Sequence, residues 1–97
     1  MIIAIDKCEK HWFAITIDPP AESVYVNLET STHGMLYFML RAYLKKYTGD
    51  VTFHIDLRDY PHIVDKVQSS LKTRFPASRI ERVEHPELWE SAGEWLD

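Results

Sequence analysis

The chain has few of the residues that mark specialised chemistry. Cysteine occurs once, at Cys8, which excludes an intramolecular disulfide and a cluster of thiolate metal ligands. Glycine occurs only at Gly34, Gly49 and Gly93, and this spacing does not form a glycine-rich phosphate loop. The sequence therefore lacks a fingerprint of nucleotide binding.

Long apolar runs are also missing. The apolar start of the chain, Ile2–Ile5, is interrupted by Asp6, and no run approaches the roughly 20 apolar residues of a membrane-spanning helix. A single cysteine agrees with a reducing compartment. We expect a cytoplasmic protein with no membrane segment, and the 97 residues suit one domain, 1–97.

Charge is spread unevenly along the chain. The formal net charge is −4, and residues 81–97 hold six acids against Arg82 alone. Because phosphate binding needs a basic face, this balance argues against nucleic acid as a ligand. An acidic C-terminal segment instead favours another protein as partner, and a homo-oligomer stays open.

The clearest local pattern is V-T-F-H-I-D-L-R-D-Y, residues 51–60, in which apolar and polar side chains alternate. This period of two predicts a strand over 51–57. Similar patterns predict strands over 2–6, 11–18 and 23–29, and a poorer edge strand over 79–84. Three-and-four spacing predicts helices over 35–47, 60–74 and 86–96.

The predicted fold is α/β (α+β), with a mixed sheet of about five strands in the order β-β-β-α-β-α-β-α and the helices packed on the sheet. Short links predict an antiparallel meander for the first three strands. The hydroxyls of residues 30–32 offer a cap for the first helix. Asp59 offers a cap for the second, with Pro61 in its first turn.

Asp6 and Asp56 are the strongest candidates for a site, because each ends a predicted strand. If the two strands are parallel neighbours, both carboxylates lie at the edge where open α/β sheets place ligands. They could then hold Mg²⁺ or Mn²⁺, with Glu29 as a possible third ligand. The alternative is that both are turn and cap residues, in which case the protein needs no cofactor.

Other candidate groups are weaker. The five histidines, His11, His33, His54, His62 and His85, show no metal-binding pair spacing on a helix. His54 and Asp56 share a strand face as a possible acid–base pair. Ser69 and Ser70 could accept phosphate or simply lie on a solvated helix face. Aromatic residues on helix 35–47 are expected in the core and at its rim, rather than as a nucleic-acid stacking platform: Tyr37, Phe38, Tyr43 and Tyr47.

Three segments resemble the STAS domains of small anti-sigma-factor antagonists. They are the helix segment 40–47, then Ile55-Asp56-Leu57-Arg58-Asp59-Tyr60, then the acidic, tryptophan-containing segment 89–96. The resemblance implies a non-enzymatic, regulatory protein-binding module. Its contact surfaces would be the helix 60–74 face and the acidic tail, with these binding residues: Asp59, His62, Asp65, Ser69, Glu87, Glu90 and Glu94.

A second resemblance is to the ribonuclease H-like layout of Holliday-junction resolvases. It rests on the first strand Ile2-Ile3-Ala4-Ile5-Asp6, the three-strand meander and Asp56 after the fourth strand. Lys7-Cys8-Glu9 stands where those enzymes have glycine. This resemblance implies a metal-dependent nuclease that uses Asp6 and Asp56 and cleaves a branched or hybrid substrate. A third hypothesis is an acidic inhibitor protein of a virus or mobile element.

Overall fold

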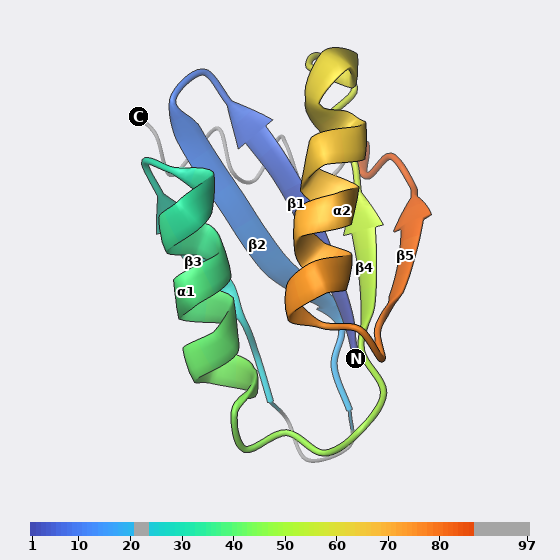
Figure 1. Cartoon of the computed structure of the whole chain (residues 1–97). Helices are drawn as coiled ribbons and strands as arrows, with labels where there is room; N and C mark the ends of the chain where they lie inside the picture. The colour runs from blue at the N-terminus through green and yellow to red at the C-terminus, as the bar shows by residue number, and fades with distance from the viewer. Residues whose placement is uncertain (21–23, 87–97) are drawn as a thin grey trace.

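The structure, a computed structural model, describes residues 1–20 and 24–86, in which five strands form one mixed sheet with two α-helices on one face (Figure 1). The elements are β1 (Ile2–Cys8), β2 (His11–Asp18), β3 (Asn27–Thr30), α1 (His33–Leu44), β4 (Thr52–Ile55), the 3₁₀-helix η1 (Pro61–Ile63), α2 (Val64–Arg74) and β5 (Arg79–Arg82). Strand order is β3-β2-β1-β4-β5. The predicted mixed α/β sheet is confirmed.

The first three strands form the predicted antiparallel meander, and β4 and β5 run parallel to β1. The link through α1 carries the chain from the sheet edge at β3 back to the free side of β1. As a result, β1, which contains Asp6, and β4, which Asp56 follows, lie next to each other, with Ile5 opposite Ile55.

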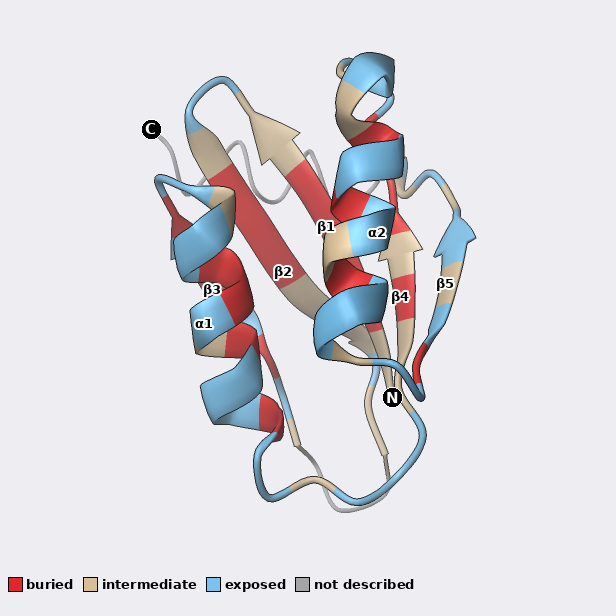
Figure 2. Ribbon diagram, viewed as in Figure 1, coloured by how far each residue is buried: buried red, intermediate tan, exposed pale blue. Residues whose placement is uncertain are grey.

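The hydrophobic core lies between the sheet and the two helices (Figure 2). Alternate side chains of a strand point to opposite faces, so Ile3 and Ile5 of β1 face the helices together with Phe53 and Ile55 of β4. All four are at most 1% exposed. They pack against one buried stripe of each helix: Leu36, Tyr37, Leu40 and Leu44 of α1, and Val64, Val67 and Leu71 of α2.

Strand β2 carries apolar side chains on both faces. Trp12 and Ala14 belong to the helix-side core, whereas Phe13 alternates to the other face and is still only 1% exposed. The second face of the sheet is therefore not an open polar surface at β2.

Helix α1 begins as predicted: the Thr32 hydroxyl accepts a hydrogen bond from the Met35 N–H at 3.2 Å. The predicted cap of the next helix is wrong. Asp59 is exposed and makes no cap, because Tyr60 is the N-cap residue of η1 and Ile63 that of α2. Neither residue forms a side-chain capping hydrogen bond. Pro61 still occupies a first-turn position, where its missing N–H costs nothing.

Several element boundaries differ from the predictions. Strand β1 continues to Cys8, since Cys8 pairs with His11 across a two-residue turn. Strand β3 starts only at Asn27, α1 ends at Leu44, and β4 ends at Ile55, before Leu57 takes a positive φ of 34°. The helix predicted over 86–96 falls almost wholly outside the described residues. Among the described helices, none has the length and apolar content to cross a membrane.

Candidate functional site

Asp6 lies in β1, two residues before its end, next to the position where Asp56 follows β4. The parallel register extends past Ile5 and Ile55, and the Asp56 N–H donates to the Ile5 carbonyl at 3.0 Å. Asp6 is 6% exposed and Asp56 is 7% exposed. By strand alternation, Asp6 shares the face of Ala4, opposite the helices. The sequence-based condition for a shared site, neighbouring parallel strands, is met.

The environment of Asp6 disfavours its charge. Burial, and to a smaller extent the negative charge of Asp56, raise the pKa of Asp6 to about 7 against the opposing effects of the Lys7 N–H, the Arg58 guanidinium and the Leu57 backbone. The Lys7 N–H donates to Asp6 Oδ1 at 2.6 Å. The buried position of Asp6 next to the Asp56 charge therefore favours its protonated form more than water would.

Asp56 is held by two groups that sequence patterns did not reveal. Arg58 places its Nε 3.2 Å from Asp56 Oδ1 and a terminal nitrogen 3.4 Å from Oδ2. The His85 N–H donates to the same Oδ2 at 2.8 Å. The Arg58 contact bridges only two residues, but the His85 contact needs the chain to return after β5, which no local pattern signals.

A histidine pair lies beside this site on the same face of β4. His54 and His85 stack with their ring planes 9° apart, and His54 Nδ1 is 3.0 Å from His85 Nε2. His54 Nε2 is 3.5 Å from a Glu81 carboxylate oxygen of the neighbouring strand β5. Burial and the neighbouring His85 lower the pKa of His54. His54 thus contacts both His85 and Glu81, and the His85 backbone N–H links this group to Asp56.

Glu29 does not join the two aspartates. It lies on β3, two strands from β1, and its carboxylate binds His11 Nδ1 at 2.8 Å. Within residues 1–20 and 24–86, no group of three or more His, Cys, Asp or Glu side chains is arranged to hold a metal ion. Among the described residues, Asp6 and Asp56 are thus the two carboxylates that this position offers to a metal.

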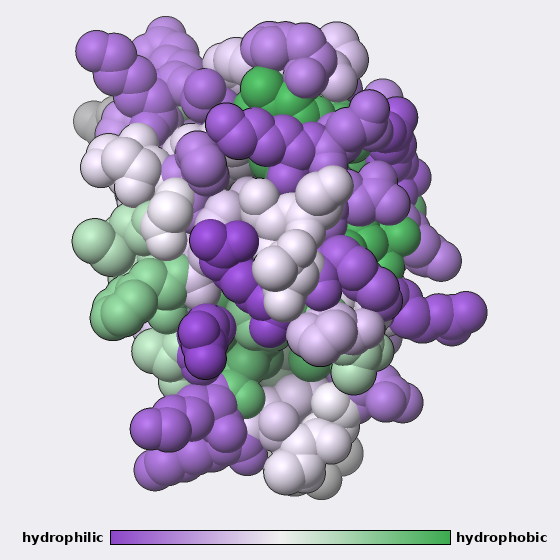
Figure 3. Space-filling model, viewed as in Figure 1, coloured by the Kyte–Doolittle hydropathy of each residue, from purple (hydrophilic) through white to green (hydrophobic). Residues whose placement is uncertain are grey.

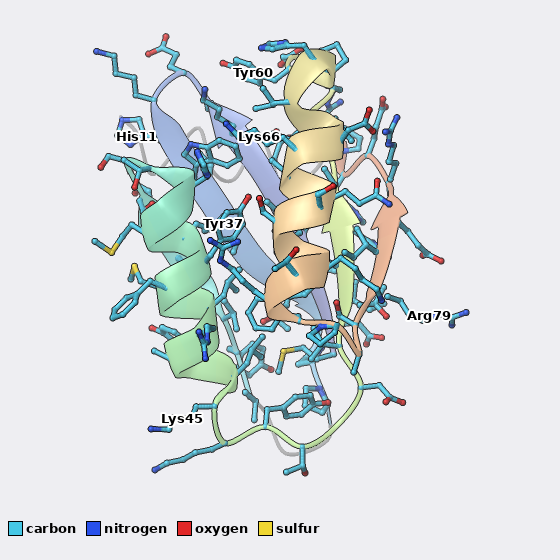
Figure 4. All side chains as sticks on the ribbon, viewed as in Figure 1. His11, Tyr37, Lys45, Tyr60, Lys66 and Arg79 are labelled. Carbon is cyan, nitrogen blue, oxygen red and sulfur yellow. The ribbon has the colours of Figure 1, made fainter. Side chains whose placement is uncertain are left out.

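A cationic side chain and two aromatic rings lie near the end of β1 and the β1–β2 turn. The Tyr60 hydroxyl accepts a hydrogen bond from the Glu9 N–H at 2.9 Å, which ties the β1–β2 turn to the chain after β4 (Figure 4). Lys7 Nζ lies 4.8 Å from the Tyr60 ring centroid and 5.4 Å from that of Trp12. By strand alternation, Lys7 lies on the helix side of β1 with Trp12, across the sheet from Asp6.

The described residues among those predicted for protein binding lie in the η1–α2 segment or just before it. Asp59, His62, Asp65 and Ser69 are all exposed, and Asp65 forms a surface ion pair with Arg82. Glu87, Glu90 and Glu94 lie outside the described residues. Ser70 is half-buried. The protein-binding role of the helix 60–74 face and the acidic tail stays a prediction.

Comparison of the chain with protein-family models, curated proteins and solved structures finds no match. Function is therefore argued from the geometry of the aspartate pair and its surroundings.

Proposed function

We propose that the protein is a metal-dependent nuclease that holds Mg²⁺ or Mn²⁺ between Asp6 and Asp56 and cleaves a branched or hybrid nucleic acid. The observation that carries the proposal is the parallel pairing of β1 with β4, which brings two buried carboxylates together at the carboxyl ends of both strands. The antiparallel meander before α1 and the aspartate after the fourth strand support the ribonuclease H-like layout that the sequence suggests.

The two aspartates fit a hard divalent cation. Mg²⁺ commonly binds proteins through one or two carboxylates, and water and substrate phosphates complete its shell. The pKa of Asp6 is raised mainly by burial and less by the Asp56 charge, and a bound cation would favour the ionised carboxylate. A bound cation would supply Lewis-acid activation of the phosphodiester and of its attacking water.

The neighbouring side chains have roles that follow from their positions. Asp6 must lose its proton to bind a cation, so binding weakens as pH falls below about 7. Arg58 contacts Asp56 from a partly exposed position. A cation at Asp56 would compete with this contact, which would leave the guanidinium able to pair with a substrate phosphate.

The test is cleavage of a labelled RNA–DNA hybrid and of a four-way DNA junction in Mg²⁺ or Mn²⁺. We expect cleavage of one of the two, with a loss of at least about 100-fold in Asp6→Asn and in Asp56→Asn, as expected when transition-state charge stabilisation is removed. Asp59→Asn is the matched control, because Asp59 is exposed and caps no helix, and it should keep full activity.

Two results would contradict this function. One is the absence of cleavage with either substrate by a folded protein in Mn²⁺. The other is cleavage that Asp6→Asn leaves unchanged, which would point to a contaminating nuclease. Calorimetric titration of Mn²⁺ into the same variants separates failed metal binding from failed chemistry.

A further inference from the structure

The helical layer of this acidic protein is basic. Segments 33–46 and 64–74 contain six Lys and Arg residues and Asp65 as the one acid. The six cations are Arg41, Lys45, Lys46, Lys66, Lys72 and Arg74, and each of them is exposed. The whole-chain charge of −4 hides this asymmetry, because the excess acids lie in other parts of the chain.

A groove opens in this layer between the carboxyl-terminal halves of α1 and α2. It has a volume of about 670 Å³. Its walls combine aromatic and cationic side chains: Phe38, Arg41, Lys45, Tyr47, Arg74 and Phe75. Of the described residues that line it, Asp50 alone is acidic. Figure 4 shows Lys45 at the lower end of α1 and Tyr37 between the two helices.

The groove presents ring surface to solvent. Phe38 is 71% exposed, although its helix pattern predicted a place in the core or at its rim. Met35 and Tyr43 of the same helix are 51% and 48% exposed. Figure 3 shows hydrophobic surface over α1 bordered by hydrophilic surface. Exposed apolar area of this kind, rimmed by charge, marks a binding surface.

We infer that this groove binds a single strand of nucleic acid, with phosphates on Arg41, Lys45 and Arg74 and a base stacked on Phe38. Single-stranded nucleic acid is bound by basic grooves that carry aromatic rings, because every base has a face to stack and every linkage a charge to neutralise. The complementary charge favours a polyanion over an apolar peptide or a second copy of this acidic chain.

Arg74, one of the cations that line the groove, contacts a residue of the hydrophobic core. The Arg74 guanidinium lies 4.6 Å from the Tyr37 ring centroid, and it donates to the Ser70 carbonyl at 3.2 Å. Tyr37 is 2% exposed and forms part of the core. The stacked ring and the carbonyl hold the Arg74 head group over the groove, so its binding to a phosphate costs less conformational entropy.

This surface is distinct from the aspartate pair and does not rest on the proposed nuclease function. The groove belongs to the helix side of the sheet, near the amino-terminal ends of β1 and β4, as the lining residues Asp50 and Val51 show. Asp6 and Asp56 lie at the opposite ends of those strands.

The test is fluorescence anisotropy with a labelled oligothymidylate of about 12 nucleotides, in EDTA so that no metal-dependent cleavage occurs. At about 50 mM salt, we expect Phe38→Ala to weaken binding about tenfold. Arg41→Glu/Lys45→Glu should weaken binding at least as much and reduce the salt dependence, by roughly 0.7 in the logarithmic slope for each phosphate that the variant no longer neutralises.

Lys10→Glu/Arg79→Glu is the matched control, since it makes the same change in net charge at exposed residues outside the groove. This variant should bind within about twofold of the unaltered protein, the spread expected for distant surface charges. Equal weakening in the control would overturn the inference, as would an unchanged dissociation constant in Phe38→Ala. Tighter binding of an oligoglutamate peptide than of the oligonucleotide would assign the groove to an acidic protein instead.

Discussion

The two faces of the sheet use the same strands for opposite purposes. On the helix side, β1 and β4 present Ile3, Ile5, Phe53 and Ile55, all at most 1% exposed and all in the core. On the other side, the same two strands lead to carboxylates and the histidine pair. A strand that alternates in polarity can therefore build a core with one half of its residues and a site with the other half.

The two faces also contribute to the free energy of folding with opposite signs. Buried apolar side chains lower the free energy of the fold in proportion to the area they remove from water. Asp6 does the reverse, because burial and the neighbouring Asp56 charge disfavour its ionised form. A site of this kind is built at a cost in stability that the apolar face must offset.

The largest effect is expected when the apolar face is broken. Phe53 is fully buried and packs against Phe75 with ring centroids 5.2 Å apart. Phe53→Ala should lower the free energy of unfolding by about 4 kcal/mol, because it removes buried apolar surface and leaves a cavity. Urea denaturation followed by circular dichroism measures this change, and Phe38→Ala, which alters an exposed ring, is the control expected to change stability by less than about 0.5 kcal/mol.

A substitution at Asp6, on the face opposite the helices, is expected to raise the free energy of unfolding rather than lower it. The pKa of Asp6 is about 7 in the folded protein, above its ordinary value of 3.8. Its contribution to stability is therefore complete below about pH 4 and is lost as pH rises through 7. Asp6→Asn removes this titration, so the variant should be more stable than the unaltered protein by up to about 4 kcal/mol near pH 8, and the gain should vanish near pH 4.

Thermal or urea unfolding across this pH range provides the measurement. Asp59→Asn is the control, because Asp59 is exposed and its replacement should leave the pH profile unchanged. A profile for Asp6→Asn that runs parallel to that of the unaltered protein would show that Asp6 is ionised throughout, and the picture of an unrelieved carboxylate pair would be wrong.

Much of the fold follows from local patterns. Alternation in residues 51–57 located β4, the spacing of apolar residues located α1, and Thr32 marked its start. The cap at Asp59 was wrong because the choice between an α-helix and a 3₁₀-turn at Pro61 depends on packing rather than on the capping residue alone. The edge strand β5 was predicted despite its few apolar residues, since it needs to bury only Ile80 partially.

The site was only half predictable. The sequence showed that Asp6 and Asp56 end strands, but their contact required the parallel neighbours that the long link through α1 creates. Two features depend on contacts between segments distant in sequence and left no local pattern: the return of His85 to Asp56 and the exposure of Phe38 beside Arg74. Similarly, the net charge of the chain does not show that helices α1 and α2 carry several exposed cations and few acids.

The smallest expected effect comes from the cation that already contacts the aspartates. Arg58 lies within 3.4 Å of both Asp56 oxygens and its side chain is 31% exposed. Because a partly exposed ion pair is worth at most about 1 kcal/mol, Arg58→Gln should tighten Mn²⁺ binding by only about two- to fivefold. Calorimetric titration near pH 8 measures this change, with Arg79→Gln as a control of equal charge. Weaker Mn²⁺ binding in Arg58→Gln would instead show that Arg58 holds Asp56 in place for the metal, because removing a pure competitor can only strengthen the binding of the cation it displaces.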